Sequence, residues 1–205
     1  MKYETIRRIK RKRPDWNPKT RGESLETLWD FVGRQLKKSR PIPKIKVIFV
    51  SHDVWLKKTR MISGGMLSDL PKGKNPKDLK QKDIDGGLVP VKKFPEAVPK
   101  KLREFDYLIY IDLNPETDLS KCFLPDDYKI FILIHELIHV YEHEINSPLF
   151  EGLDNSQDLT FLIFQRFGKR KRKLWKWLLE NSYVITEEED GIKLILGFPE
   201  EILCK

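Results

Sequence analysis

Hydrophobic residues recur along the first half of the chain at spacings that predict one helix and two strands. Residues 23–38 carry apolar side chains at helical spacing, and prolines follow directly after this range. The β-branched run at 46–50 predicts a short strand. Residues 105–113, rich in Ile, Leu and Tyr, predict the strongest strand of the chain.

The second half of the chain has patterns of three helices and a hairpin. The helices are expected over residues 126–147, 154–168 and 173–179. Asp126 and Asp127 favour the start of the first helix, and Pro148 ends it. The strands of the hairpin are expected at 183–186 and 192–196, on either side of an acidic turn.

A Lys-, Pro- and Gly-rich stretch at 64–87 lies between these patterns. It predicts an extended loop, with one hairpin near Met61–Met66. The chain therefore predicts an α+β fold with a small mixed sheet packed on helices. Its expected parts are a basic N-terminal arm at 1–21 and a single domain at 22–205, whose core spans about 44–168 and whose basic helix and hairpin span 169–205.

Length and composition indicate an ordinary folded domain. The chain has 205 residues, of which 40% are hydrophobic, enough to bury a core. It shows neither a signal peptide nor an apolar run that could span a membrane. Cys122 and Cys204 form neither a disulfide framework nor a metal-ligand spacing, so we expect an intracellular, cytoplasmic protein. The charged fraction of 34% is typical of thermophilic proteins.

The net charge of +8 is concentrated in basic tracts at 7–13, 72–82 and 169–173. The last tract consists of Lys169, Arg170, Lys171, Arg172 and Lys173. It could bind nucleic acid by displacing counterions from phosphates, while Trp175 and Trp177 stack on bases. The alternative is that the charges are solvated and that the tryptophans pack in the core, as the helical spacing of Trp175 and Leu178 indicates.

The most specific motif of the chain is His135-Glu136-Leu137-Ile138-His139, which lies inside the helix expected over residues 126–147. Residues four apart share a helix face, with Cβ atoms roughly 6 Å apart, so His135 and His139 can bind one tetrahedral Zn²⁺. Glu136 projects beside the metal, where it can accept a proton from a zinc-bound water. The motif predicts a zinc hydrolase. The alternative, a core helix with two incidental histidines, would bury polar groups at a cost.

A catalytic zinc normally has a third protein ligand, and the candidates follow the motif. They are His143, Glu151, Asp154 and Asp158. On a continuous helix His143 lies about 12 Å along the axis from His135, which favours instead a role in the cleft or at the surface. Asp154 and Asp158 lie four apart on one face of the next helix, where their alternative role is to favour the helix start.

The motif, the strand before it and the Asp-rich turn after it resemble the zincin metallopeptidases, in particular the gluzincin and aspzincin groups. The resemblance implies a zincin-like sheet and a second, ligand-bearing helix, with Asp154 as zinc ligand and Asp158 orienting His135. Asp158 as ligand and Asp154 as helix cap is the alternative assignment.

Two narrower groups are also similar. Residues 105–168 resemble the small metallopeptidases encoded by phages and archaeal viruses, which have a His-Asp pair near the position of Gln157-Asp158. The SprT-like proteases, which cleave proteins crosslinked to DNA, are the second group, and the basic tracts suit their function.

The resemblance also implies a substrate-binding strand, which would hold an extended peptide by main-chain pairing. Its candidate residues are Tyr107, Leu108, Ile109 and Tyr110, for which an interior strand of the core is the alternative. Candidates for stabilising the oxyanion are Tyr107, Tyr110, Tyr141, His143 and Tyr183.

These features predict a zinc-dependent metalloendopeptidase that acts on a peptide or protein substrate. A metal-activated water attacks the peptide carbonyl, with Glu136 as general base and then acid. The alternatives are a basic nucleic-acid-binding protein with a structural or vestigial zinc site, and a DNA-associated, SprT-like protease.

Overall fold

The computed structural model describes most of the chain from residue 23 onward. The described residues are 23–52, 85–95, 98, 100–147, 149, 153–188 and 191–198. Of these, residues 153–156, 186–188 and 191–195 are described by their backbone alone. The expected basic arm at 1–21, the hairpin near Met61–Met66 and the tract at 72–82 lie outside the described residues.

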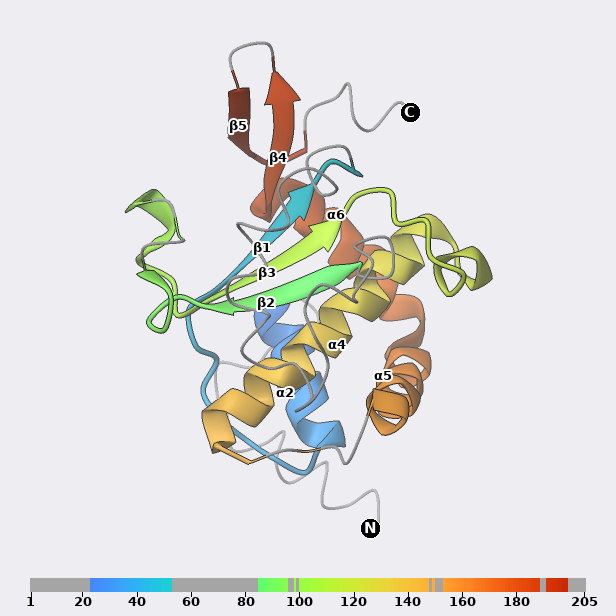
Figure 1. Ribbon diagram of the computed structural model, residues 1–205. Helices are drawn as coiled ribbons and strands as arrows, with labels where there is room; N and C mark the ends of the chain where they lie inside the picture. The colour runs from blue at the N-terminus through green and yellow to red at the C-terminus, as the bar shows by residue number, and fades with distance from the viewer. Residues whose placement is uncertain are drawn as a thin grey trace.

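A mixed five-stranded sheet forms one layer of the molecule (Figure 1). Its strands, in spatial order, are β2 (Gly86–Pro90), β3 (Tyr107–Asp112), β1 (Ile45–Val50), β4 (Tyr183–Glu188) and β5 (Gly191–Leu196). The three central strands are parallel, and each outer strand is antiparallel to its neighbour. The α+β class with a mixed sheet and a C-terminal hairpin is therefore confirmed.

The outer strand β2 was not predicted, because its first residues were assigned to the long loop. Gly86 and Gly87 begin the strand and Pro90 ends it, and both residue types are uncommon in strands. Proline is tolerated at the edge of a sheet, where one side of the strand has no partner strand. Gly and Pro are thus compatible with an edge strand, but a segment of this composition does not predict a strand.

Four helices lie where the hydrophobic spacing predicted helices. They are α2 (Leu25–Gln35), α4 (Pro125–Ile145), α5 (Leu153–Phe167) and α6 (Lys171–Asn181). Short 3-10 turns are at Lys100–Leu102, Ser120–Cys122 and Gly168–Arg170. Ser24 and Thr27 form a capping box on α2, and Pro125 begins α4, with Asp126 and Asp127 in its first turn.

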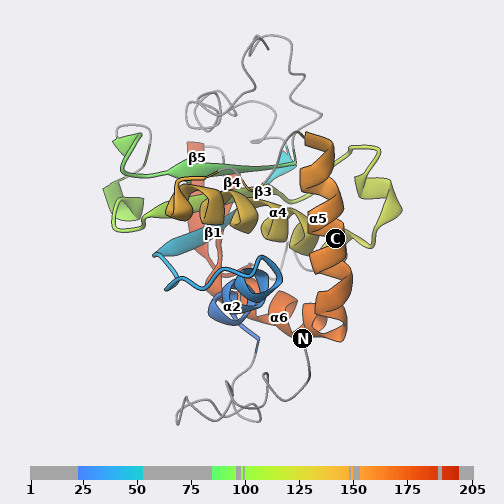
Figure 2. The same ribbon diagram turned by 90° about the horizontal axis from the view of Figure 1, so that it is seen from below.

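The two faces of the sheet are covered differently. Alternate side chains from β1 and β3, including Val47, Phe49, Ile109 and Ile111, join a large core with the four helices. Figures 1 and 2 show α2, α5 and α6 gathered around α4 on this side of the sheet. The remaining side chains, including Ile48 and Leu108, pack with Val98 and Leu102 on the opposite face. Among the described residues, no helix is long and apolar enough to cross a membrane.

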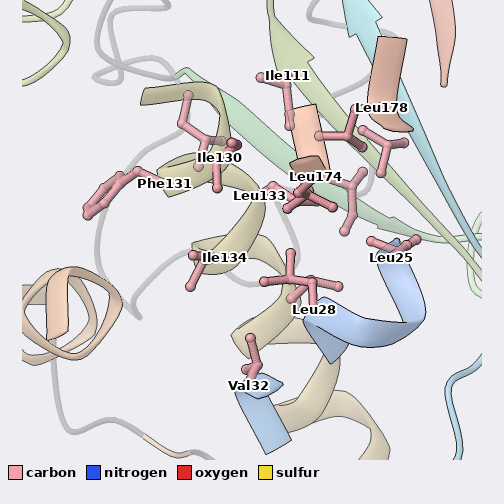
Figure 3. Packing of buried hydrophobic residues seen from close by; sticks show 14 of the residues in the cluster. Leu25, Leu28, Val32, Ile111, Ile130, Phe131, Leu133, Ile134, Leu174 and Leu178 are labelled. Atoms are coloured by element: carbon pink, nitrogen blue, oxygen red, sulfur yellow. The ribbon is translucent and has the colours of Figure 1, made fainter. Parts of the chain in front are cut away.

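Helix α4 is the centre of the core. Its residues Ile130, Leu133 and Ile134 pack among side chains from α2 and α6 (Figure 3). Near its C-terminal end, the ring of Tyr141 stacks on Trp29 with centroids 3.8 Å apart. The Tyr141 hydroxyl donates to the carbonyl of Trp29 at 3.0 Å. This contact fixes α2 against the half of α4 that carries the histidines.

Gly33 is required for this contact between helices. A Cβ at Gly33 would overlap the Tyr141 hydroxyl and lie 2.7 Å from the Lys38 carbonyl. We expect Gly33→Ala to lower the free energy of unfolding by about 1–3 kcal/mol through overpacking. Denaturant titration measures the loss, and Glu26→Gln on the exposed side of α2 is the control. Equal stability of the Gly33 variant and the wild type would contradict the packing described here.

Candidate metal centre

The two histidines of the motif converge on one point beside α4. Both ring planes project from the same face of the helix, and their Nε2 atoms lie 3.1 Å apart. Two nitrogens that each bind a tetrahedral zinc at about 2.0–2.1 Å are roughly 3.3 Å apart. The separation of the Nε2 atoms therefore fits two ligands of one metal ion.

Each histidine also has an oxygen next to its other ring nitrogen. The Nδ1 atom of His139 lies 2.7 Å from Oε2 of Glu142, and that of His135 lies 3.2 Å from Oγ1 of Thr160. Such outer partners orient metal-binding imidazoles and determine which nitrogen carries the proton. With both Nδ1 atoms protonated, both Nε2 lone pairs face the same point, and a cation bound there would offset their repulsion.

His135 is held in its neutral form. Burial, followed by the neighbouring His139, lowers its pKa from the ordinary 6.5 to about 4. A neutral imidazole keeps a lone pair for a metal ion at neutral pH, whereas a protonated ring cannot bind one. His139 is more open, with 37% of its side chain exposed. Both histidines are half-buried, and His139 is the one whose side chain is more open.

Glu136 lies on the side of α4 that faces the sheet, below the edge strand β2. The residue is 7% exposed, and burial raises its pKa to about 7, an effect that nearby His139 opposes. A Cβ on Gly86 would overlap Ile132 and lie 3.2 Å from Oε1 of Glu136. The absence of a side chain at Gly86 thus allows the strand to lie directly over the carboxylate. A carboxyl group that titrates near neutral pH is suited to accept and return a proton.

The third ligand is not identified by the described residues. Within them, no group of three His, Cys, Asp or Glu side chains could hold a metal ion. Glu151 lies outside the described residues, and Asp154 lies in α5 with an undescribed side chain. Their assignments as ligands stay predictions. His135 and His139 fit two positions of a zinc site, and the segment that follows α4 carries the candidates for the third.

Two further candidates for the third ligand, Asp158 and His143, lie within the described residues. Asp158 is exposed on α5, and Thr160, two residues later, lies at the ring nitrogen that we expected Asp158 to orient. Helix α4 continues without a break through His143, whose ring lies 6.1 Å from that of Tyr107. The helix break that would bring His143 to the other histidines does not occur.

The prediction that residues Tyr107–Tyr110 hold a substrate strand is wrong. They lie in β3, which pairs with β2 on one side and with β1 on the other. Both edges of this strand are occupied by main-chain hydrogen bonds, so it has the interior position that was the alternative. Among the described strands, none pairs with the outer side of β2, whose residues Gly87–Pro90 are buried.

The backbone of β2 has groups directed toward this outer side. Asp85 accepts from the N–H of Asp112, and Val91 donates to the carbonyl of Asp106. Antiparallel pairing alternates between inward and outward positions, so the N–H and C=O groups of Gly86 and Leu88 point away from β3. They lie on the strand that passes over Glu136.

Several oxyanion candidates have other partners. The hydroxyl of Tyr107 donates to Glu144 at 2.8 Å, and that of Tyr141 donates to Trp29. Tyr110 and Tyr183 belong to the core on the face of the sheet opposite α4. A cavity of about 160 Å³ lies elsewhere, between Lys46 and Trp177, and none of the motif residues lines it.

The basic tract at the start of α6 is partly used within the fold. Arg170 makes two hydrogen bonds to the carboxylate of Glu23, at 2.9 and 2.7 Å, and Lys171 pairs with Asp127 at 2.7 Å. Lys169, Arg172 and Lys173 are exposed. Trp175 and Trp177 pack against the core, in agreement with the packing alternative for these residues.

The two partners of the histidines, Glu142 and Thr160, were not predicted from the sequence. Glu142 follows His139 by three residues, so helical spacing could have placed it on the same face. Thr160 approaches His135 only because α5 packs against α4, and no local pattern indicates that contact.

No protein-family model, no curated protein and no solved structure matches the chain.

The raised pKa of Glu136 predicts a pH dependence of stability in metal-free protein. Between about pH 4.5 and 7 the carboxyl is protonated in the folded state and ionised in the unfolded state. Wild-type stability should therefore fall with rising pH relative to Glu136→Gln, by about 1–3 kcal/mol in total. Denaturant unfolding with a chelator present measures this difference. A difference that stays constant from pH 4 to 8 would contradict it.

Proposed function

We propose that the protein is a zinc-dependent metallopeptidase with a zincin-like arrangement of sheet and helix. The observation that carries the proposal is the convergence of Nε2 of His135 and Nε2 of His139, which lie 3.1 Å apart. The oxygens beside both Nδ1 atoms support it, because such contacts are typical of metal-binding histidines. A zinc ion held there would supply a Lewis acid and lower the pKa of a bound water.

Glu136 is the general base and acid in this proposal. Its carboxylate lies beneath the edge strand, next to His135 in sequence, and burial raises its pKa to about 7. It accepts a proton from the attacking water and later returns the proton to the leaving amine. The third ligand in this proposal is one of the carboxylates that follow α4, with Asp154 our first choice.

The proposed substrate is an extended peptide or protein segment that pairs with β2. Gly86 and Leu88 offer outward-pointing N–H and C=O groups, and the strand passes directly over Glu136. An added strand would gain main-chain hydrogen bonds and place a peptide bond near the carboxylate. β2 thereby replaces β3 as the proposed substrate-binding strand, because β3 already pairs with a strand on each side.

The direct test combines zinc content with cleavage of an unfolded protein. We expect close to one equivalent of zinc per chain and cleavage of fluorescently labelled casein. Glu136→Gln should retain zinc while cleavage falls by a factor of about 100 or more, because a general base is lost. Metal analysis and the fluorescence assay measure the two properties separately.

Glu144→Gln is the matched control, since it changes another hydrogen-bonded glutamate on the same helix. It should retain both zinc and cleavage. The proposal is contradicted if the wild-type protein binds no zinc, or if Glu136→Gln cleaves as fast as the wild type.

Nucleic acid is a second candidate partner, through the exposed part of the basic tract. Lys169, Arg172 and Lys173 are exposed, whereas Arg170 and Lys171 pair with acidic residues of the fold. We propose that these three cations could contact phosphates, which would restrict proteolysis to proteins on nucleic acid. The partly buried tryptophans lend no support to base stacking.

Replacing Lys169, Arg172 and Lys173 together by alanine tests this candidate. Binding of the wild type to DNA should weaken steeply with salt, and the triple variant should bind more weakly with a smaller salt dependence. Fluorescence anisotropy with single- and double-stranded DNA measures both effects. Identical binding by the variant, or no binding by the wild type, would remove nucleic acid as a partner of this surface.

A further inference from the structure

The Glu142 side chain contacts both a histidine of the motif and the chain that follows α4. Its Oε2 atom lies 2.7 Å from Nδ1 of His139, and its Oε1 atom accepts the N–H of Leu149 at 2.8 Å. Leu149 comes after the end of α4. The helix ends at Asn146, whose backbone is in the left-handed conformation with a φ of 50°. One carboxylate therefore contacts both a proposed metal ligand and the chain after the end of α4.

The two histidines differ in how firmly their protonation is set. A carboxylate only accepts hydrogen bonds, so the contact with Glu142 places a proton on Nδ1 of His139, and in the neutral ring Nε2 then keeps its lone pair. The hydroxyl of Thr160 can donate or accept, so the contact at Nδ1 does not by itself decide which nitrogen of His135 carries the proton. Without metal, Nε2–H of His135 can donate to Nε2 of His139 across the observed 3.1 Å.

Glu142 is not suited to be a metal ligand itself. Its carboxylate lies on the Nδ1 side of His139, whereas the two Nε2 atoms face each other on the other side of the rings. Only 19% of the Glu142 side chain is exposed, and both of its oxygens have partners. Its contacts act on the position of other groups.

We infer that Glu142 is a positioning residue for the metal centre, an inference that rests on the proposed function. It fixes His139 in the tautomer that binds metal through Nε2. It also accepts the N–H of Leu149, which comes before Glu151 and Asp154, our candidates for the third ligand, in the sequence. A single side chain thus positions one proposed ligand and contacts the chain shortly before the candidates for another.

Glu142→Gln tests the inference with little change in shape. The amide has one oxygen, which can accept from His139 or from Leu149, and its NH2 group then opposes the other N–H donor. If the amide donates to Nδ1 of His139, the proton of the ring moves to Nε2 and blocks the metal. We expect zinc affinity to fall at least tenfold, the range seen when such outer partners are removed.

Two measurements separate this role from a general loss of structure. Nitrogen-15 NMR of the metal-free wild type should show the His139 proton on Nδ1, and Glu142→Gln should lose that preference. Competition with a chromophoric chelator gives the zinc affinity. Glu144→Gln is the matched control, and both its tautomer and its affinity should equal those of the wild type.

The outcomes distinguish this inference from the proposed function. A wild-type protein that binds no zinc overturns the proposed function. Zinc bound equally well by wild type and Glu142→Gln overturns only the role of Glu142. If that variant does not fold, the wild-type spectrum still decides, because a His139 proton on Nε2 in the metal-free protein overturns the inference.

Discussion

The burial of α4 is the constraint on which the rest of the structure depends. The helix lies between the sheet and the other helices, and its side chains from Tyr128 to Ile134 are buried. A helix in this position must be apolar on nearly every side, and each polar group on it costs free energy unless it has a partner. Glu136 and the two histidines interrupt this apolar surface within one and a half turns. The two histidines offset part of this cost through the oxygens of Thr160 and Glu142 beside their Nδ1 atoms.

The surroundings of the histidines link the site to the packing of helices. The partner of His139 is Glu142 of the same helix, so that contact can form whenever α4 forms. His135 receives Thr160 from α5, and the contact exists only when α5 is docked. A metal ion bound by both histidines would then stabilise the docked arrangement, because binding free energy at such a site contributes to folding.

Much of the fold follows from local pattern, and the exceptions have physical reasons. The helices and the parallel strands have strong periodicity, so their positions agree with the predictions to within a few residues. β2 was missed because Gly86, Gly87 and Pro90 lack strand propensity and fit only at an edge. The closeness of His135 and His139 could be predicted because residues four apart share one face of a helix. Thr160 and the interior position of β3 depend on tertiary pairing, which no local pattern records.

The outer edge of β2 has a further consequence for the behaviour of the protein in solution. A strand edge that could pair with a peptide could equally pair with the edge of another molecule and begin aggregation, although Gly87–Pro90 are buried in this structure. The outward positions of this strand are Gly86, Leu88 and Pro90, and proline has no N–H to donate. A ladder growing along this edge therefore loses a hydrogen bond at Pro90. Any pairing along this edge would therefore be short.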